Sequence, residues 1–314
     1  MDIARDIMRA ANDKGWSKML ENITKQKWFP IFCAYAGHIL WGFSYLFTKT
    51  ALQTASSNVL LSYRFIFAAL LMTGIIVSGK VQVSLKGKNW GVAAILAILQ
   101  LLYYSFETSA IDYTNTTISG AVLAVAPVLA IIFAVIFLKE FPTKRQAVFC
   151  ILPVLGVIIM TVAGSSLGIV SAKGALFLAL TCVTSGAYKT VNRKTAEEFT
   201  SFERTYIVLT ASAIGFTISA LKDVGGDIGA YLAPMMVPSF LLSVATLGLF
   251  CSIGANLLVN YAVGKMSVVK VSSFGAITTL CSMFSGVIFL GEPMTLSLLV
   301  GASLILIGIY QVTK

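Results

Sequence analysis

Four ionisable side chains lie inside long apolar stretches of this sequence: His38, Lys49, Arg64 and Glu107. An ionisable group inside a bilayer is costly unless it is paired or hydrated, so each marks a candidate functional site. Lys49, Arg64 and Glu107 fall near the same end of three successive apolar segments and so share one layer. Glu107 could pair with both cations as an outer gate. Alternatively, the cations could receive a solute carboxylate while Glu107 takes the solute amine or a proton, or the group could be a structural salt bridge with Lys49 extending outward.

His38 lies deeper in its segment, about 12 Å from the N-terminal end at 1.5 Å per residue. Histidine titrates near neutral pH, which makes it a candidate proton carrier. A neutral histidine that is hydrogen-bonded to a neighbouring helix is the alternative. The candidate residues for gating or proton coupling are therefore His38, Lys49 and Glu107.

Polar side chains and aromatic side chains with polar tips recur in the apolar segments. Such groups could line a cavity and contact an apolar or aromatic solute, although anchoring at the interface and helix packing also explain them. Asn256 and Asn260 lie four residues apart on one helix face, where solute contact and packing between helices are both open. The candidate solute-binding residues are Trp41, Tyr45, Arg64, Tyr103, Tyr188, Asn256 and Asn260.

The composition places these residues in a membrane protein. Of 314 residues, 57% are hydrophobic and 11% are charged, whereas soluble domains carry about 25% charged residues. Apolar runs of about 20 residues span a bilayer as helices. We predict an all-α polytopic membrane protein with ten transmembrane helices, at 30–51, 58–78, 90–110, 117–138, 147–163, 174–192, 203–221, 238–263, 267–290 and 296–312. The short connectors leave no room for a soluble domain.

The net charge of +10 follows from the topology. If the N-terminus is cytoplasmic, 19 of the 23 lysine and arginine residues fall in the N-terminal tail, near the cytoplasmic ends of spans or at the C-terminus. The positive-inside rule then places both termini in the cytoplasm. We therefore expect a multi-pass protein of a prokaryotic cytoplasmic (plasma) membrane, with the lipid bilayer as a partner and without a nucleic-acid partner.

The first 28 residues form a separate segment. They lack the apolar stretch and the cleavage site of a signal peptide. Ile3, Ile7 and Ala11 recur at helical spacing opposite arginine and lysine. This pattern predicts a cytoplasmic amphipathic helix on the inner leaflet, with a disordered tail as the alternative.

One short stretch occurs twice, as FLKEFPT at 137–143 and as FLGEPMT at 289–295. The offset of 152 residues also pairs Gly156 with Gly308. A weaker match between WGFSY at 41–45 and SGAY at 185–188 pairs the first predicted span with the sixth. The pairings predict two repeats of five helices, at 29–164 and 174–314.

An odd number of spans per repeat makes the second repeat enter the membrane from the opposite side. The charges agree, because cytoplasmic Lys144 and Arg145 follow the first copy and no basic residue follows the second within its connection. Inverted repeats of this kind favour alternating access, in which a site at their interface opens to one side and then the other.

Four stretches resemble the EamA-type carriers of the drug/metabolite transporter superfamily: WGFSYLFTKTAL (41–52), SYRFIFAALL (62–71), YTNTTISGAVLAVAPVLAIIFAVIFLKE (113–140) and KMSVVKVSSFGAITTLCSMFSGVIFLGEPMT (265–295). The resemblance implies ten helices in two inverted repeats and the transport of amino acids, related metabolites or other small organic solutes. We accordingly expect secondary transport, with export as its direction, protons as a candidate coupling ion, and a monomer or weak homodimer.

The sequence does not predict an enzyme. It has one histidine, and it lacks HExxH, a phosphate-binding loop and a GxSxG in a strand–turn–helix context. The five cysteines are dispersed without metal-ligand spacing. We therefore expect no catalytic residues, cofactor or metal. A membrane sensor or scaffold is the alternative function, and it would be expected to carry a soluble output domain.

Overall fold

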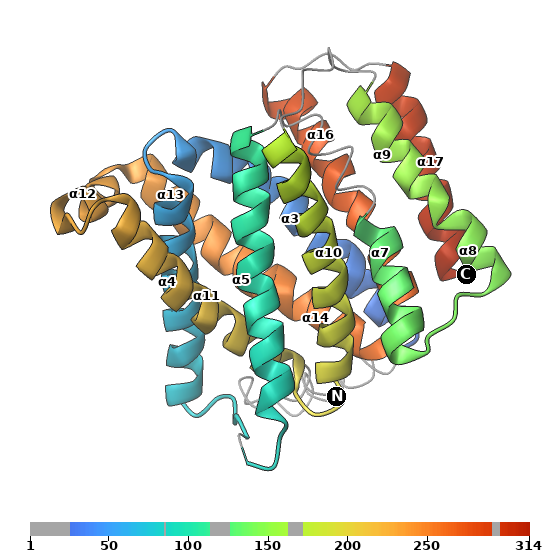
Figure 1. Cartoon of the computed structure of the whole chain (residues 1–314), viewed down its shortest axis with the longest axis horizontal. Coiled ribbons are helices and arrows are strands. Elements are labelled where there is room, and N and C mark those ends of the chain that lie inside the picture. Colours follow the sequence, from blue (N-terminus) through green and yellow to red (C-terminus); the bar gives the residue numbers. More distant parts are fainter. Residues whose placement is uncertain (1–25, 85, 114–125, 163–171, 291–295) are drawn as a thin grey trace. The chain divides into compact units, whose positions relative to one another are not determined.

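The computed structural model describes residues 26–84, 86–113, 126–162, 172–290 and 296–314, and every regular element in these ranges is a helix (Figure 1). Within these residues, six helices are long and apolar enough to cross a membrane: Phe29–Leu52, Ser57–Val77, Trp90–Glu107, Ala172–Thr195, Ser201–Asp223 and Pro238–Lys265. Shorter apolar helices cover Val128–Leu138, Val268–Cys281 and Leu299–Thr313. The predicted amphipathic helix at 1–28 lies almost wholly outside the described residues.

Six predicted spans correspond to continuous helices: α3 (Phe29–Leu52), α4 (Ser57–Val77), α5 (Trp90–Tyr113), α10 (Ala172–Thr195), α11 (Ser201–Asp223) and α17 (Leu296–Thr313). Side-chain caps set the beginnings of two of them. The Ser56 hydroxyl accepts from the Val59 N–H at α4, and Thr200 and Glu203 form a reciprocal capping box at α11. Such caps satisfy backbone N–H groups that have no partner within the helix.

Other predicted spans are divided. The eighth consists of α13 (Pro238–Thr246), the π-helix η3 (Leu247–Gly254) and α14 (Ala255–Lys265). The described part of the fourth is α7 (Ala126–Phe133) and the π-helix η1 (Ala134–Leu138). The fifth consists of α8 (Lys144–Phe149) and α9 (Ile151–Val162), and the ninth consists of α15 (Val268–Ser273) and α16 (Gly275–Leu290). Two short helices, α12 (Ile228–Leu232) and η2 (Ala233–Met236), precede α13.

The chain forms two compact units. Unit 1 comprises residues 1–97 and 195–265, and unit 2 comprises residues 98–194 and 266–314. Each unit therefore combines helices from both predicted repeats.

In unit 1, α4 packs against α11 along its length. Three hydrogen bonds join the pair: Asn58 with Asp223 at 2.9 Å, Ser62 with Thr217 at 2.9 Å and Thr73 with Tyr206 at 3.1 Å. The beginning of one helix meets the end of the other, so the two are antiparallel. Ser62 and Tyr206 are 144 residues apart, and so are Thr73 and Thr217. The hydrogen bond between Ser62 and Thr217 therefore has its counterpart, at an offset of 144 residues, in the hydrogen bond between Tyr206 and Thr73. The same offset aligns Gly42 with Gly186.

In unit 2, α9 and α17 lie side by side (Figure 1). A Cβ atom at Gly156 would lie 2.8 Å from the Ile305 Cγ1 atom, and one at Gly308 would collide with the Pro153 ring. Glycine lets the two helices approach this closely. Gly156 and Gly308 are 152 residues apart, as are Pro153 and Ile305. At the predicted offset, the contact of Gly156 with Ile305 therefore corresponds to the contact of Gly308 with Pro153.

Candidate functional site

A buried polar stripe runs along η3 and α14 in unit 1. Ser252, Asn256 and Asn260 recur every four residues and are all buried, so they share one helix face. The Asn256 amide donates to the Ser252 carbonyl at 2.7 Å, and the Asn260 amide donates to the Thr205 hydroxyl of α11 at 2.8 Å. The predicted pair of asparagines therefore faces the interior of unit 1.

Arg64 of α4 contacts the same stripe. Its side chain is 6% exposed, its Nε donates to the Ser252 hydroxyl at 2.7 Å, and its guanidinium lies 5.5 Å from the Phe65 ring centroid. No carboxylate among the described residues of unit 1 lies within ion-pair distance of it. A guanidinium has five N–H donors and a charge that is expensive to bury without an anion. Arg64 thus combines a buried charge with donor capacity for an anionic group.

Helix α3 meets this stripe through Trp41. The Trp41 indole donates to the Cys251 carbonyl at 2.9 Å, and the Cys251 thiol contacts the Leu40 carbonyl at 3.3 Å. Cys251 lies in the π-helix η3, a geometry that often marks functional sites in helices. His38 is buried, with its ring 5.2 Å from the Trp41 ring in an edge-on arrangement. The structure therefore brings His38, Trp41, Arg64 and the stripe together in unit 1.

The other candidates are in unit 2 or have undescribed side chains. The Tyr103 hydroxyl donates to Glu107 Oε1 at 2.7 Å, one turn further along α5. Tyr188 is half-buried in α10. Glu107 and Arg64 belong to different units, and their pairing stays a prediction. Tyr45 and Lys49 belong to α3, but their side chains are outside the described set and their roles also stay predictions.

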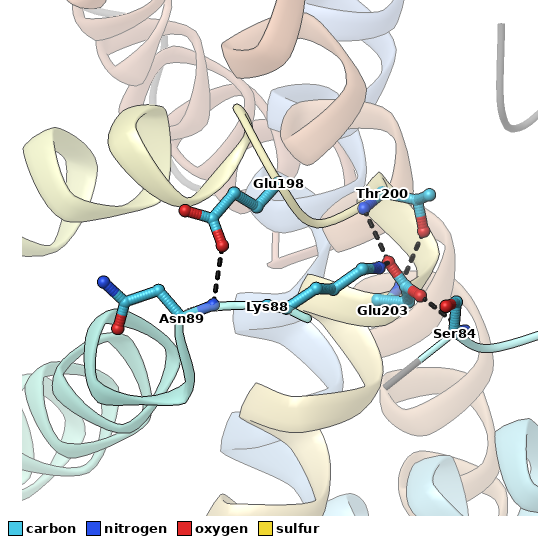
Figure 2. Close-up of polar contacts among 6 residues, drawn as sticks. All are labelled: Ser84, Lys88, Asn89, Glu198, Thr200 and Glu203. Carbon is cyan, nitrogen blue, oxygen red and sulfur yellow. Dashed lines mark hydrogen bonds and ion pairs between the residues drawn. The ribbon is translucent and has the colours of Figure 1, made fainter. Parts of the chain in front are cut away.

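Two buried charges went unrecognised in the sequence. Glu203 and Arg204 are each 2% exposed in the first turn of α11, at the beginning of the predicted span 203–221. Figure 2 shows the carboxylate of Glu203 accepting from the Ser84 N–H at 3.0 Å, the Lys88 ammonium at 2.5 Å and the Thr200 N–H at 2.9 Å. The capping-box pattern of Thr200 and Glu203 is the sequence signal that would have placed the beginning of the helix before both charges, at Ser201.

In the first copy of the repeated stretch, Glu140 connects three segments of unit 2. Its Oε1 lies 3.0 Å from Arg193 Nε at the end of α10, and its Oε2 accepts from the Val268 N–H at 2.8 Å, at the beginning of α15. Lys139, directly before it, ends η1 with φ of 55°. The second copy of the acid, Glu292, lies outside the described residues.

Long apolar helices with buried ionisable and polar residues define a polytopic membrane protein. The EamA-like transporter family matches this chain twice, at residues 28–162 and 172–314. The chain belongs to that family, which is a family of transporters and not of enzymes, and the resemblance seen in the sequence is confirmed.

Two relatives from Bacillus subtilis (strain 168) match over most of the chain. The uncharacterized transporter YcxC is 34% identical over 287 residues, covering 88% of this chain and 91% of its own. The uncharacterized transporter YvbV is 28% identical over 273 residues, covering 86% and 87% respectively. A solved crystal structure, 18% identical, has a TM-score of 0.76 and covers 90% of this chain and 98% of its own. That likeness shows a shared fold.

Proposed function

We propose that the protein is a secondary transporter that exports small organic metabolites, namely amino acids or related solutes, by alternating access between two inverted five-helix repeats at 29–164 and 174–314. The observation that carries this proposal is that contacts between helices recur at the offsets between the repeats, at 144 residues for α4 and α11 and at 152 residues for α9 and α17. The family membership supports transport, and the buried Arg64 supports a solute with a carboxylate.

The recurring contacts support inversion as follows. Helices α4 and α11 are the second helices of the two repeats, and their contacts recur at the offset while the helices run antiparallel. Two equivalent helices that run antiparallel are related by a two-fold axis across them. A two-fold axis along the membrane normal would leave equivalent helices parallel, whereas an axis in the membrane plane reverses one of them.

Arg64 supports recognition of an anionic solute. Its counterpart at the 144-residue offset is Val208, which is also buried, so helix packing at this level does not require a charge. A carboxylate can accept two parallel hydrogen bonds from a guanidinium. In this proposal Arg64 binds the solute carboxylate, with Trp41, Asn256 and Asn260 as its neighbours in unit 1.

The remaining candidates have auxiliary roles in the proposal. Tyr45, Tyr103 and Tyr188 contribute aromatic contacts, and His38, Lys49 and Glu107 are the residues assigned to gating or proton coupling. Protons are the proposed coupling ion, and the proposed assembly is a monomer or weak homodimer.

The proposed topology has ten spans and both termini in the cytoplasm of a prokaryotic cell. Contacts within each unit support it, because they join connections assigned to one side. Lys88 meets Glu203 in unit 1, and Glu140 meets Arg193 in unit 2. Cysteine labelling of intact cells tests the assignment, since position 144 should react only after the membrane is permeabilised.

Transport is tested with purified protein in liposomes, screened against labelled amino acids and other small carboxylates with and without a proton gradient. The proposal predicts protein-dependent movement of at least one carboxylate. It also predicts that dissipating the gradient abolishes accumulation. A folded protein that moves none of these solutes would contradict the proposal.

A further inference from the structure

We propose that Glu203 and Arg204 form an anchor that fixes the unit 1 segment next to each of the three passages of the chain between unit 1 and unit 2; the chain leaves unit 1 at the first and third passages and re-enters it at the second. The passages occur after residues 97, 194 and 265. The two anchor residues are adjacent in the first turn of α11, and each is 2% exposed. Between them they contact a segment next to every passage.

The first passage follows residues 84–90, which precede and begin α5. Glu203 accepts from the Ser84 N–H and from Lys88. Beside this contact, the Asn89 N–H donates to Glu198 at 2.6 Å, as drawn in Figure 2. The Trp90 ring packs edge-on against Phe199 with centroids 5.5 Å apart. The beginning of α5 is therefore held on the connection that leads into α11.

The second passage follows α10 and leads into residues 195–200. The Phe199 N–H bonds the Thr195 carbonyl at 2.9 Å, which closes a turn directly after the passage. Thr200 and Glu203 then exchange hydrogen bonds, the Thr200 N–H donating to Glu203 and the Glu203 N–H donating to the Thr200 hydroxyl at 3.2 Å. One carboxylate thus fixes both this connection and the preceding one.

The third passage follows α14. Arg204 Nη2 donates to the Asn260 carbonyl at 2.5 Å. The neighbouring Thr205 hydroxyl accepts from the Asn260 amide, so both faces of this residue are bound to α11. Further along, a Cβ atom at Gly264 would lie 3.4 Å from Arg204 Nη2. The last turns of α14 are therefore held against the same turn of α11.

Packing alone does not require these charges. The positions 144 residues earlier are Val59 and Leu60, which are buried at 3% and 1% exposure at the opposite end of the α4–α11 pair. At that end the two helices are joined by the exposed hydrogen bond between Asn58 and Asp223. A buried carboxylate and guanidinium are retained at a desolvation cost that their hydrogen bonds must offset. The charged end is also the end at which the three passages are held.

The anchor makes Glu203 and Arg204 positioning residues. Every contact described for them lies inside unit 1, so the anchor belongs to unit 1 alone. Only the consequence for transport rests on the alternating-access function proposed above.

Spin-label distance measurements on full-length protein in nanodiscs test the anchor without a solute. In a variant in which the five native cysteines are replaced, labels are attached at exposed Lys80 of unit 1 and exposed Lys144 of unit 2. In the protein with its anchor intact, the distribution of distances between the two labels is expected to consist of narrow components. Glu203→Gln and Arg204→Gln should lose those narrow components, because the passages are no longer fixed.

The matched control is Asp223→Asn, which weakens the other end of the same helix pair and should leave the narrow components intact. Lys88→Met replaces Glu203→Gln if the latter does not fold, and it should broaden the distances in the same way. Narrow components that persist in the anchor variants would overturn the proposal, and so would equal broadening in the control. In liposomes, the folded anchor variants should show slower transport with unchanged solute affinity. Absence of transport by the unmodified protein would contradict the proposed function while leaving the distance result to decide the anchor.

Discussion

Gly156 of α9 and Gly308 of α17 are 152 residues apart in the chain, and each lies where its own helix makes a close contact with the other. A side chain at Gly156 would meet Ile305 and the Gly301 carbonyl, and one at Gly308 would meet Pro153. Because both the glycines and their neighbours are 152 residues apart, the offset found in FLKEFPT and FLGEPMT is also an offset between contacts in space.

Substitution of either glycine should destabilise the protein. Gly156→Ala and Gly308→Ala each force a methyl group into backbone or a proline ring, and overpacking of this kind costs about 1–3 kcal/mol. Thermal unfolding in detergent measures the effect. Gly74→Ala in α4 is the control, since a Cβ atom there has no neighbour within 4 Å. Two glycine variants as stable as the control would show that the close approach is not required.

Lys139→Gly should stabilise the protein. Lys139 has φ of 55°, a left-handed conformation that costs a residue with a Cβ atom about 1–2 kcal/mol relative to glycine. The second copy of the repeat has Gly291 at this position. A rise in melting temperature is expected, whereas Lys144→Gly at the beginning of α8 should not raise it. A lower melting temperature for Lys139→Gly would show that the lysine side chain has its own stabilising role.

Glu140→Gln should weaken the bridge that Glu140 makes between Arg193 at the end of α10 and Val268 at the beginning of α15. The change removes the charge that pairs with Arg193 and weakens the acceptor for the Val268 N–H, and we expect a loss of about 1–2 kcal/mol for this partly exposed group. A double-mutant cycle with Arg193→Gln measures the pair directly. Additive effects of the two changes would mean that the ion pair contributes nothing to stability.

Arg64→Met and Arg204→Met should have opposite effects on stability. Arg64 is bonded to a neutral hydroxyl, so removing its charge removes a desolvation cost, and the melting temperature should stay the same or rise. Arg204 bonds the Asn260 carbonyl beneath the last turns of α14, so its loss removes a hydrogen bond from a charged donor to a buried acceptor, at a cost of about 1–3 kcal/mol. A strongly destabilised Arg64→Met would identify Arg64 as a structural residue.

The helical architecture follows from hydropathy, because transfer to lipid requires long apolar helices. α4 and α11, for example, lie within two residues of their predicted boundaries. Interruptions are harder to predict, and η3 has no proline within it to mark the change of hydrogen-bond pattern. Pairing is harder still. The sequence indicated that Arg64, Asn256 and Asn260 need partners, but hydropathy does not encode which helix supplies them.

The burial of Glu203 and Arg204 was missed for a related reason. Charges next to a connection count toward the topology whether they face water or the protein interior, so the positive-inside rule does not separate the two cases. The local pattern of Thr200 followed by Glu203 indicates a helix that begins before Glu203 and Arg204.

Solute counterflow in liposomes tests the central claim most directly. Vesicles that contain the protein are loaded with an unlabelled carboxylate solute found in the screen and diluted into a trace of the labelled solute. The account predicts transient accumulation of label by the unmodified protein and none by equally folded Arg64→Met. Equal accumulation by the two proteins would contradict carboxylate recognition by Arg64, and no accumulation by either would contradict transport by alternating access.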